Sequence, residues 1–174
     1  LEHVVVKDFS YGIWIAAFDE FDGGRISVAN CTVRDCSQVA MWFDHATVRD
    51  CLIQRCGGDG LRVDLSTIEN VIIERAGGHG ITGNVNTIRN CILRFCGGNG
   101  INASDSVVTD VTVSGCANGI AANNSSLGHA TVFNNRSHGL DGSGNIVANS
   151  VFRSNAGTGV NGPSNTFKNV TANN

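Results

Sequence analysis

The sequence contains little that would build a helical or membrane-spanning protein. Its 174 residues include one proline, and only 6% of them are aromatic. No run of about 18 apolar residues is present, and apolar residues never gather at helical spacing. The formal net charge of -3 is unlike that of a nucleic-acid-binding surface, which is strongly basic. We therefore expect neither nucleic acid nor a membrane as a partner.

Glycine is abundant instead, with 22 residues, and it helps to mark a repeat. The segments Thr47–Cys51, Thr67–Val71 and Thr87–Cys91 share one pattern and recur every 20 residues. A short apolar run follows each segment, and then a glycine turn such as Gly57–Gly60 or Gly77–Gly80. This repeat length is typical of a solenoid, in which each unit buries its apolar face only against its neighbours.

Superposing the repeats gives three apolar columns. One contains Val33, Ile53, Ile73, Leu93, Val113, Phe133 and Phe152; the second contains Met41, Leu61, Ile81, Ile101, Ile120, Leu140 and Val160; the third contains Val48, Ile68, Ile88, Val108, Val147 and Phe167. Three columns predict three short strands per coil, with alternate residues pointing inward. The predicted fold is all-β: a right-handed parallel β-helix of about eight coils with a period of roughly 20 residues. A left-handed β-helix is excluded because it is built on hexapeptide units, and 20 residues are not a multiple of six. A leucine-rich repeat is excluded because leucine is too sparse.

A fourth column is polar and predicts a tight turn. It contains Asn30, Asp50, Asn70, Asn90, Asp110, Asn149 and Asn169, and it is interrupted at Ala130. Asn and Asp tolerate tight bends and the left-handed backbone conformation. Stacked on successive coils, these side chains can hydrogen-bond to one another, so we expect an asparagine ladder.

These coils resemble the parallel β-helix repeats of the pectate-lyase-like superfamily, which includes polysaccharide lyases, polygalacturonases, mannuronan epimerases and phage tailspikes. The resemblance covers nearly the whole chain and implies a polysaccharide partner and a place outside the cell or on its surface. It specifies the fold and not the chemistry, so lyase, hydrolase and epimerase-like activities all stay open. Asp44-His45 is not the Asp-Pro-His-Glu motif expected of the epimerases.

The repeats predict a single β-helix domain over residues 1–174. The chain begins without Met and within a repeat, so we expect it to be a piece of a longer protein. An insertion interrupts the first coil at about residues 14–25. It is interpreted either as part of a functional site or as a cap over the open end of the β-helix.

The insertion also carries a candidate calcium site, because Ca²⁺ favours several oxygen ligands. The candidate ligands are Asp19, Glu20 and Asp22, which we expect to converge with Asp44 and Asp64. No other cofactor is predicted.

The strongest candidate for a functional surface is an outward strip near the insertion. Met41 and Phe43 belong inside, so Trp42 and Asp44 point outward. The same register adds residues from the neighbouring coils, with His45 adjacent: Trp14, Arg62, Asp64 and Asn84. Sugars need a flat apolar surface for ring stacking and a polar rim for hydroxyls. We therefore assign substrate binding to Trp14, Trp42, Arg62 and Asn84, and catalysis to Asp44, Asp64 and His45.

A further outward column is aliphatic and is expected to be an exposed ribbon. It includes Leu52, Ile72, Ile92, Val132 and Val151. Exposed apolar surface of this kind indicates a contact with a second copy or with the parent chain.

The seven cysteines fall into two columns of the repeat. These are Cys31, Cys51 and Cys91, and Cys36, Cys56, Cys96 and Cys116. Neighbours in a column lie about 4.8 Å apart, so Cys31–Cys51, Cys36–Cys56 and Cys96–Cys116 are feasible disulfides. Val71 and Ala76 occupy the same columns, which favours reduced thiols that fill a narrow interior. A linear stack does not supply the convergent ligands of a zinc site.

The predicted function is that of a carbohydrate-active or carbohydrate-binding β-helix module that acts on a polysaccharide. The alternative is a non-catalytic structural or adhesive segment of a larger surface protein.

Overall fold

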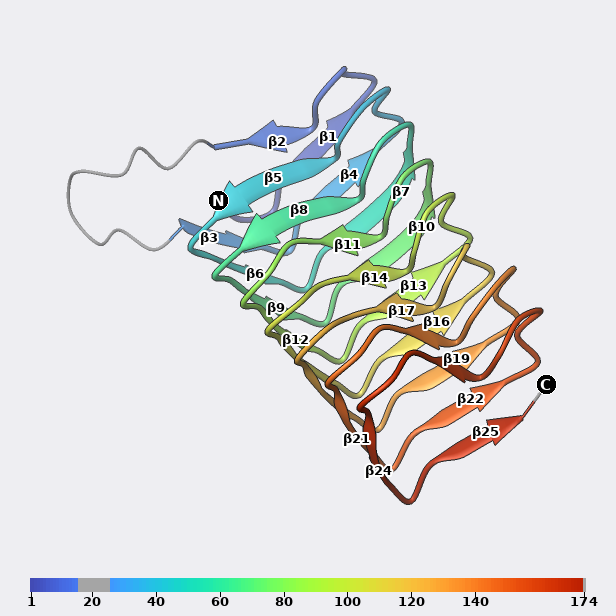
Figure 1. Cartoon of the computed structure of the whole chain (residues 1–174). Coiled ribbons are helices and arrows are strands. Elements are labelled where there is room, and N and C mark those ends of the chain that lie inside the picture. The colour runs from blue at the N-terminus through green and yellow to red at the C-terminus, as the bar shows by residue number, and fades with distance from the viewer. Residues whose placement is uncertain (16–25, 174) are drawn as a thin grey trace.

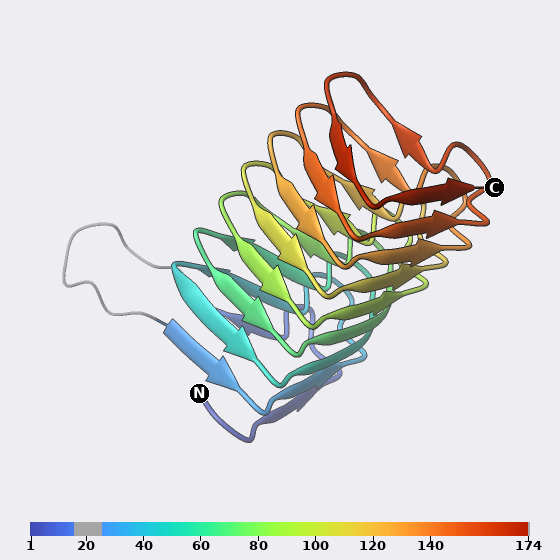
Figure 2. The same cartoon turned by 90° about the horizontal axis from the view of Figure 1, so that it is seen from below.

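The computed structural model describes residues 1–15 and 26–173. Within them every regular element is a β-strand, and no helix is long and apolar enough to cross a membrane. The chain winds in coils stacked along one axis, and its two termini lie at opposite ends of the stack (Figure 1). Figure 2 shows that the arrows of each sheet point the same way in coil after coil. The predicted right-handed parallel β-helix with three strands per coil is confirmed.

The described strands form three parallel sheets of nine, eight and eight strands, called here the first, second and third sheets. The first sheet contains β1 (Val5–Lys7), β4 (Thr32–Arg34), β7 (Leu52–Cys56), β10 (Ile72–Ala76), β13 (Ile92–Arg94), β16 (Thr112–Ser114), β19 (Thr131–Phe133), β22 (Val151–Arg153) and β25 (Thr171–Asn173). The second contains β2 (Ile13–Trp14), β5 (Met41–Asp44), β8 (Leu61–Asp64), β11 (Ile81–Thr82), β14 (Ile101–Asn102), β17 (Ile120–Ala121), β20 (Leu140–Asp141) and β23 (Val160–Asn161). The third contains β3 (Ile26–Ala29), β6 (Ala46–Arg49), β9 (Thr67–Glu69), β12 (Thr87–Arg89), β15 (Val107–Thr109), β18 (Ser126–Gly128), β21 (Ile146–Ala148) and β24 (Thr166–Lys168).

Equivalent residues of successive coils stack directly on one another and build the core. In the first sheet Ile73 pairs with Ile53 on one side and Leu93 on the other, and all three are fully buried. The preceding residue, Ile72, points outward and is 37% exposed. β-Branched residues suit this pleated surface, where one face is buried along the whole strand. Burial therefore comes from stacking coils, since one coil alone has no interior.

One predicted column is displaced by one residue. Val113 pairs with Val132 and not with Phe133, because the turn between β16 and β17 is one residue shorter than the equivalent turn between β13 and β14. Val132 is fully buried, whereas the Phe133 ring lies on the outside, 4.8 Å from the guanidinium carbon of Arg153. The assignment of Val132 to the aliphatic ribbon was therefore wrong. The structure places the other members of the ribbon on the outer face, half-buried or exposed: Leu52, Ile72, Ile92 and Val151.

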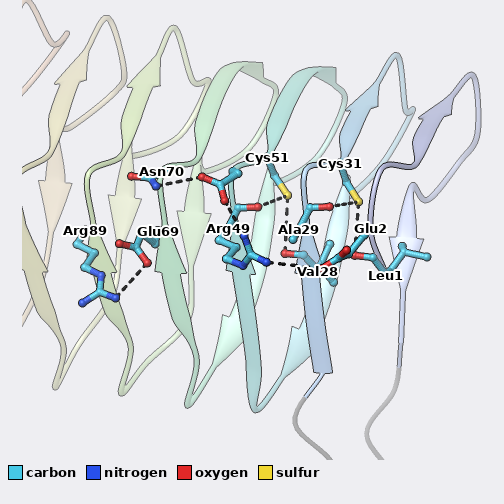
Figure 3. A network of polar contacts seen from close by, with 11 residues as sticks. Leu1, Glu2, Val28, Ala29, Cys31, Arg49, Cys51, Glu69, Asn70 and Arg89 are labelled. Carbon is cyan, nitrogen blue, oxygen red and sulfur yellow. Dashed lines mark hydrogen bonds and ion pairs between the residues drawn. The ribbon is translucent and has the colours of Figure 1, made fainter.

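The predicted turn column adopts the left-handed backbone conformation. Asp50 has φ 56° and Asn70 has φ 54°, and the Asn70 amide donates to the Asp50 carboxylate over 3.0 Å (Figure 3). The predicted interruption at Ala130 was wrong, because His129 occupies this turn with φ 51°. Its backbone N–H donates to the Ala148 carbonyl at the equivalent step of the stack.

A second polar column, missed in the sequence, lies inside the corner between the second and third sheets. The backbone N–H of Ser66 donates to Asn86 Oδ1 over 2.9 Å, and that of Asn86 to Ser106 Oγ over 3.0 Å. All three side chains are buried. The Asn86 amide also donates to the Val63 carbonyl. These contacts satisfy backbone groups that would otherwise be buried without partners where the strands end.

All seven cysteines are buried free thiols. The Cys51 thiol donates to the Arg49 carbonyl over 3.1 Å, and Cys31 makes the equivalent contact with Ala29 over 3.2 Å (Figure 3). In a later coil the Ser150 hydroxyl makes the same contact with its own neighbour two residues back. These cysteines are therefore small buried residues at the corners of the coils, and their S–H groups are weak hydrogen-bond donors. This agrees with the prediction that reduced thiols fill the narrow interior.

Burial should make these thiols slow to react in the native protein. Desolvation raises the pKa of Cys51 to about 11 and that of Cys56 to about 12, and only the thiolate is a good nucleophile. A thiolate-directed reagent at mildly alkaline pH should therefore modify the native chain slowly. After denaturation without reductant it should titrate five or more of the seven thiols. A single free thiol would establish three disulfides and contradict this account.

The inward columns should carry the stability of the stack. Ile101 is fully buried, so Ile101→Ala should lower the free energy of unfolding by about 2–5 kcal/mol. Its neighbour Asn102 points outward, and Asn102→Ala should cost less than about 0.5 kcal/mol. Denaturant titration of both variants tests this, and equal losses would show that the inward and outward assignments are wrong.

Candidate functional site

Two indoles and a guanidinium lie in a row on the outer face of the second sheet. Trp14 pairs with Trp42, and Trp42 pairs in turn with Arg62 on the next coil. The indole centroids are 5.7 Å apart, and the ring planes are inclined by 22°. The Arg62 guanidinium carbon lies 5.0 Å from the Trp42 ring centroid, which is cation–π range. The predicted order of this row is therefore confirmed.

The row does not leave both indoles open. Trp42 has the Trp14 ring on one side and the Arg62 guanidinium on the other, and its side chain is half-buried. Trp14 is 60% exposed, and the Tyr11 ring lies tilted beside it. The expectation that Trp42 offers a flat face for stacking was therefore wrong, because both faces of its ring are covered.

Two carboxylates follow the indole row one step further along the strands. Asp44 and Asp64 are partners in the register of β5 and β8, so they lie side by side on adjacent coils. Asp64 Oδ1 accepts a hydrogen bond from the backbone N–H of Asn84 over 2.5 Å. Asn84 repeats the contact one coil later, where its Oδ1 accepts from the N–H of Ser104. The Asn84 N–H thus fixes one carboxylate oxygen of Asp64. The Asp44 carboxylate has no hydrogen-bond or ion-pair partner among the described residues.

Arg62 forms a long ion pair with a carboxylate from the preceding turn. Its Nε lies 4.0 Å from Asp59 Oδ2, and the Asp59 side chain is largely buried. The other oxygen of Asp59 accepts the backbone N–H of His79 over 2.8 Å. His79 Nδ1 in turn accepts the backbone N–H of Asn99, so Asp59, His79 and Asn99 link three successive coils at this turn. Asp59 therefore supplies a counter-charge to Arg62, a role that the sequence did not predict.

These side chains surround one hollow of about 390 Å³ on the outer face of the second sheet. It is lined by Trp42, Asp44, Arg62, Asp64, Thr82, Gly83 and Asn84. The lining combines an indole, a guanidinium, two carboxylates, a hydroxyl and an amide. The lining is mostly polar and has one aromatic wall, so it suits a polar ligand better than an apolar one.

His45 lies next to the hollow but is not part of its lining. It is exposed, it has φ 54°, and its backbone N–H donates to the Asp64 carbonyl over 3.0 Å. The structure therefore brings Asp44 and Asp64 together and places His45 at the turn that follows. The catalytic assignment of these three residues stays a prediction.

Residues 16–25, which make up most of the predicted insertion, lie outside the described residues. This range includes Asp19, Glu20 and Asp22, so the proposed calcium ligands and the proposed cap stay predictions. Among the residues that the structure describes, no group of three or more His, Cys, Asp or Glu side chains is arranged to hold a metal ion. Asp44 and Asp64 supply only two acidic ligands.

The fold and its repeats define a class, the right-handed parallel β-helices. The family described as right handed beta helix region matches residues 4–137, and the chain belongs to this family. A search of the curated proteins finds no match.

Solved structures resemble the chain over almost all its length at low sequence identity. The periplasmic alginate epimerase AlgG gives a TM-score of 0.73 at 14% identity, covering 97% of this chain and 50% of its own. An alginate lyase from Paenibacillus sp. gives 0.68 at 12% identity, covering 96% and 71%. The siphovirus 9NA tailspike receptor binding domain gives 0.63 at 16% identity, covering 96% and 46%. The chain thus spans half of the epimerase, and at these identities the likeness shows the fold alone.

Asp64 offers a test of which contacts at the hollow are structural. Asp64→Asn keeps an oxygen that can accept the Asn84 N–H, as Asn84 itself does for Ser104, so the free energy of unfolding should change by less than about 0.5 kcal/mol. Asp64→Ala removes the acceptor and should cost about 1 kcal/mol. If both variants melt alike in denaturant, the hydrogen bond does not contribute to stability.

Proposed function

We propose that this chain is a carbohydrate-binding β-helix module and that the hollow on the second sheet is its glycan site. The observation that carries the proposal is the lining itself, in which the Trp42 ring borders two carboxylates, a guanidinium, a hydroxyl and an amide. A pyranose has apolar C–H faces and a rim of hydroxyls, so it needs both kinds of group. The fold is also that of an alginate epimerase and an alginate lyase, proteins that act on a polysaccharide.

Each side chain has a role in this proposal. Trp42 and Trp14 supply apolar contact to the sugar ring, and Arg62 donates to ring or hydroxyl oxygens while it braces the Trp42 ring. Asp44 and Asp64 accept from hydroxyls, and Asn84 contributes its amide to the rim. The same pair of carboxylates is what general acid–base chemistry would use, so a lyase-, hydrolase- or epimerase-like reaction would take place there. The module would then work outside the cell or on its surface.

The second candidate function is a structural or adhesive segment of a larger surface protein. The observation that favours it is the outward ribbon of the first sheet, which includes Ile72 with 37% of its surface exposed. The ribbon would then contact a second copy or the parent chain. This candidate predicts that the hollow binds no glycan.

Removing the indole wall should weaken glycan binding. Trp42→Ala takes away the apolar wall and the surface on which Arg62 rests, and it should cost about 1–2 kcal/mol of binding free energy, since it removes apolar area that a bound sugar would bury. Titration of wild type and variant with a panel of neutral, amino-sugar and uronate oligosaccharides measures this. Asn161→Ala, on the outer face of the same sheet but several coils away from the hollow, is the control. If no glycan binds the wild type, or if both variants bind equally, the proposal is wrong.

A further inference from the structure

We propose that the hollow selects a sugar that carries an ammonium group, as in a hexosamine polymer, and discriminates against uronates. The inference rests on the proposed function, since it names the class of glycan for the same site. This preference would be opposite to the charge of alginate, the polymer of uronic acids on which two proteins of similar fold act.

The balance of charge at the hollow is negative. Its lining contains the carboxylates of Asp44 and Asp64 and the guanidinium of Arg62. Arg62 already has a counter-charge, since its Nε lies 4.0 Å from the carboxylate of Asp59. Neither Asp44 nor Asp64 forms an ion pair within the described part of the chain. Two carboxylates are therefore left without a compensating positive charge.

The two carboxylates are placed to share one cation. As register partners on adjacent parallel strands, Asp44 and Asp64 have Cα atoms about 4.8 Å apart. Like charges in directly opposite positions of a sheet destabilise it, and a positive group between them removes this repulsion. Asp64 Oδ1 accepts the Asn84 N–H on the side away from Asp44, which leaves Asp64 Oδ2 for a contact shared with Asp44. A sugar carboxylate in the same place would add a third negative charge.

The surroundings favour an organic ammonium over a bare metal ion. The described residues contain no group of three or more His, Cys, Asp or Glu side chains that could hold a metal ion. An ammonium has three N–H donors and can donate to both carboxylates at once. The Trp42 wall then contacts the ring that carries the ammonium, and Thr82 and Asn84 face its hydroxyls. One hexosamine unit thus uses the acidic pair and the apolar wall together.

Three oligosaccharides of equal length test the proposal: a glucosamine oligomer, its N-acetylated counterpart and a mannuronate oligomer. Titration calorimetry of the whole chain with each should give the tightest binding for glucosamine, about tenfold weaker binding for the neutral N-acetylated oligomer and the weakest for mannuronate. The preference should shrink at high salt, because exposed charges are screened. The double variant Asp44→Asn, Asp64→Asn should bind glucosamine and its N-acetylated form equally.

A matched control separates local from overall charge. The double variant Asp110→Asn, Asp141→Asn removes the same two charges outside the hollow and should keep the wild-type preference. Equal loss of the preference in both double variants would attribute it to net charge and overturn the inference. Mannuronate binding as tight as that of glucosamine, with or without Ca²⁺, would also overturn it while the proposed function stands. Binding of none of the three would overturn the proposed function itself.

Discussion

Backbone hydrogen bonds between successive coils, in register from one end of the described stack to the other, are the interaction on which the structure depends. They bring equivalent residues together, so that Ile53, Ile73 and Leu93 form one continuous buried column. Backbone bonds continue through the turns at Asp50 and Asn70, whereas side chains replace strand bonding at the corner between the second and third sheets. There the Ser66 N–H donates to Asn86 Oδ1, and the Asn86 N–H donates to Ser106 Oγ. Without those buried acceptors this corner would leave polar backbone groups unpaired.

The same register produces the candidate site, which has no dedicated element of its own. Stacking places Trp14, Trp42 and Arg62 in one outward row and Asp44 beside Asp64 in the next. A β-helix can thus assemble a binding surface from single residues on consecutive coils, while the inward residues of the same strands hold them in place. A change at an outward position need not disturb the core, so one fold can carry different activities.

The periodicity of the sequence was sufficient to predict the coils, the three sheets and most inward residues, because a residue and its equivalent about 20 positions later share one environment. It failed at Val132 and Phe133, where a shortened turn shifted the register and both residues are apolar. At the site, alternation predicted which side chains point outward. It did not predict that Arg62 covers one side of Trp42 or that Asp59 forms a long ion pair with Arg62, since these contacts depend on side-chain conformation. The buried Ser66 column was missed because small polar residues in a turn are usually solvated.

Amide hydrogen exchange tests the central claim most directly, namely that side-chain acceptors carry the coil register through the corner between the second and third sheets. The backbone amides of Ser66 and Asn86 donate to side chains, whereas those of Ile72 and Ile92 donate to backbone carbonyls of the preceding coil. The account predicts that all four amides are protected to a similar degree and exchange only when the stack opens as a unit. Exchange of the Ser66 and Asn86 amides at the rate of an unstructured loop, with Ile72 and Ile92 still protected, would contradict it.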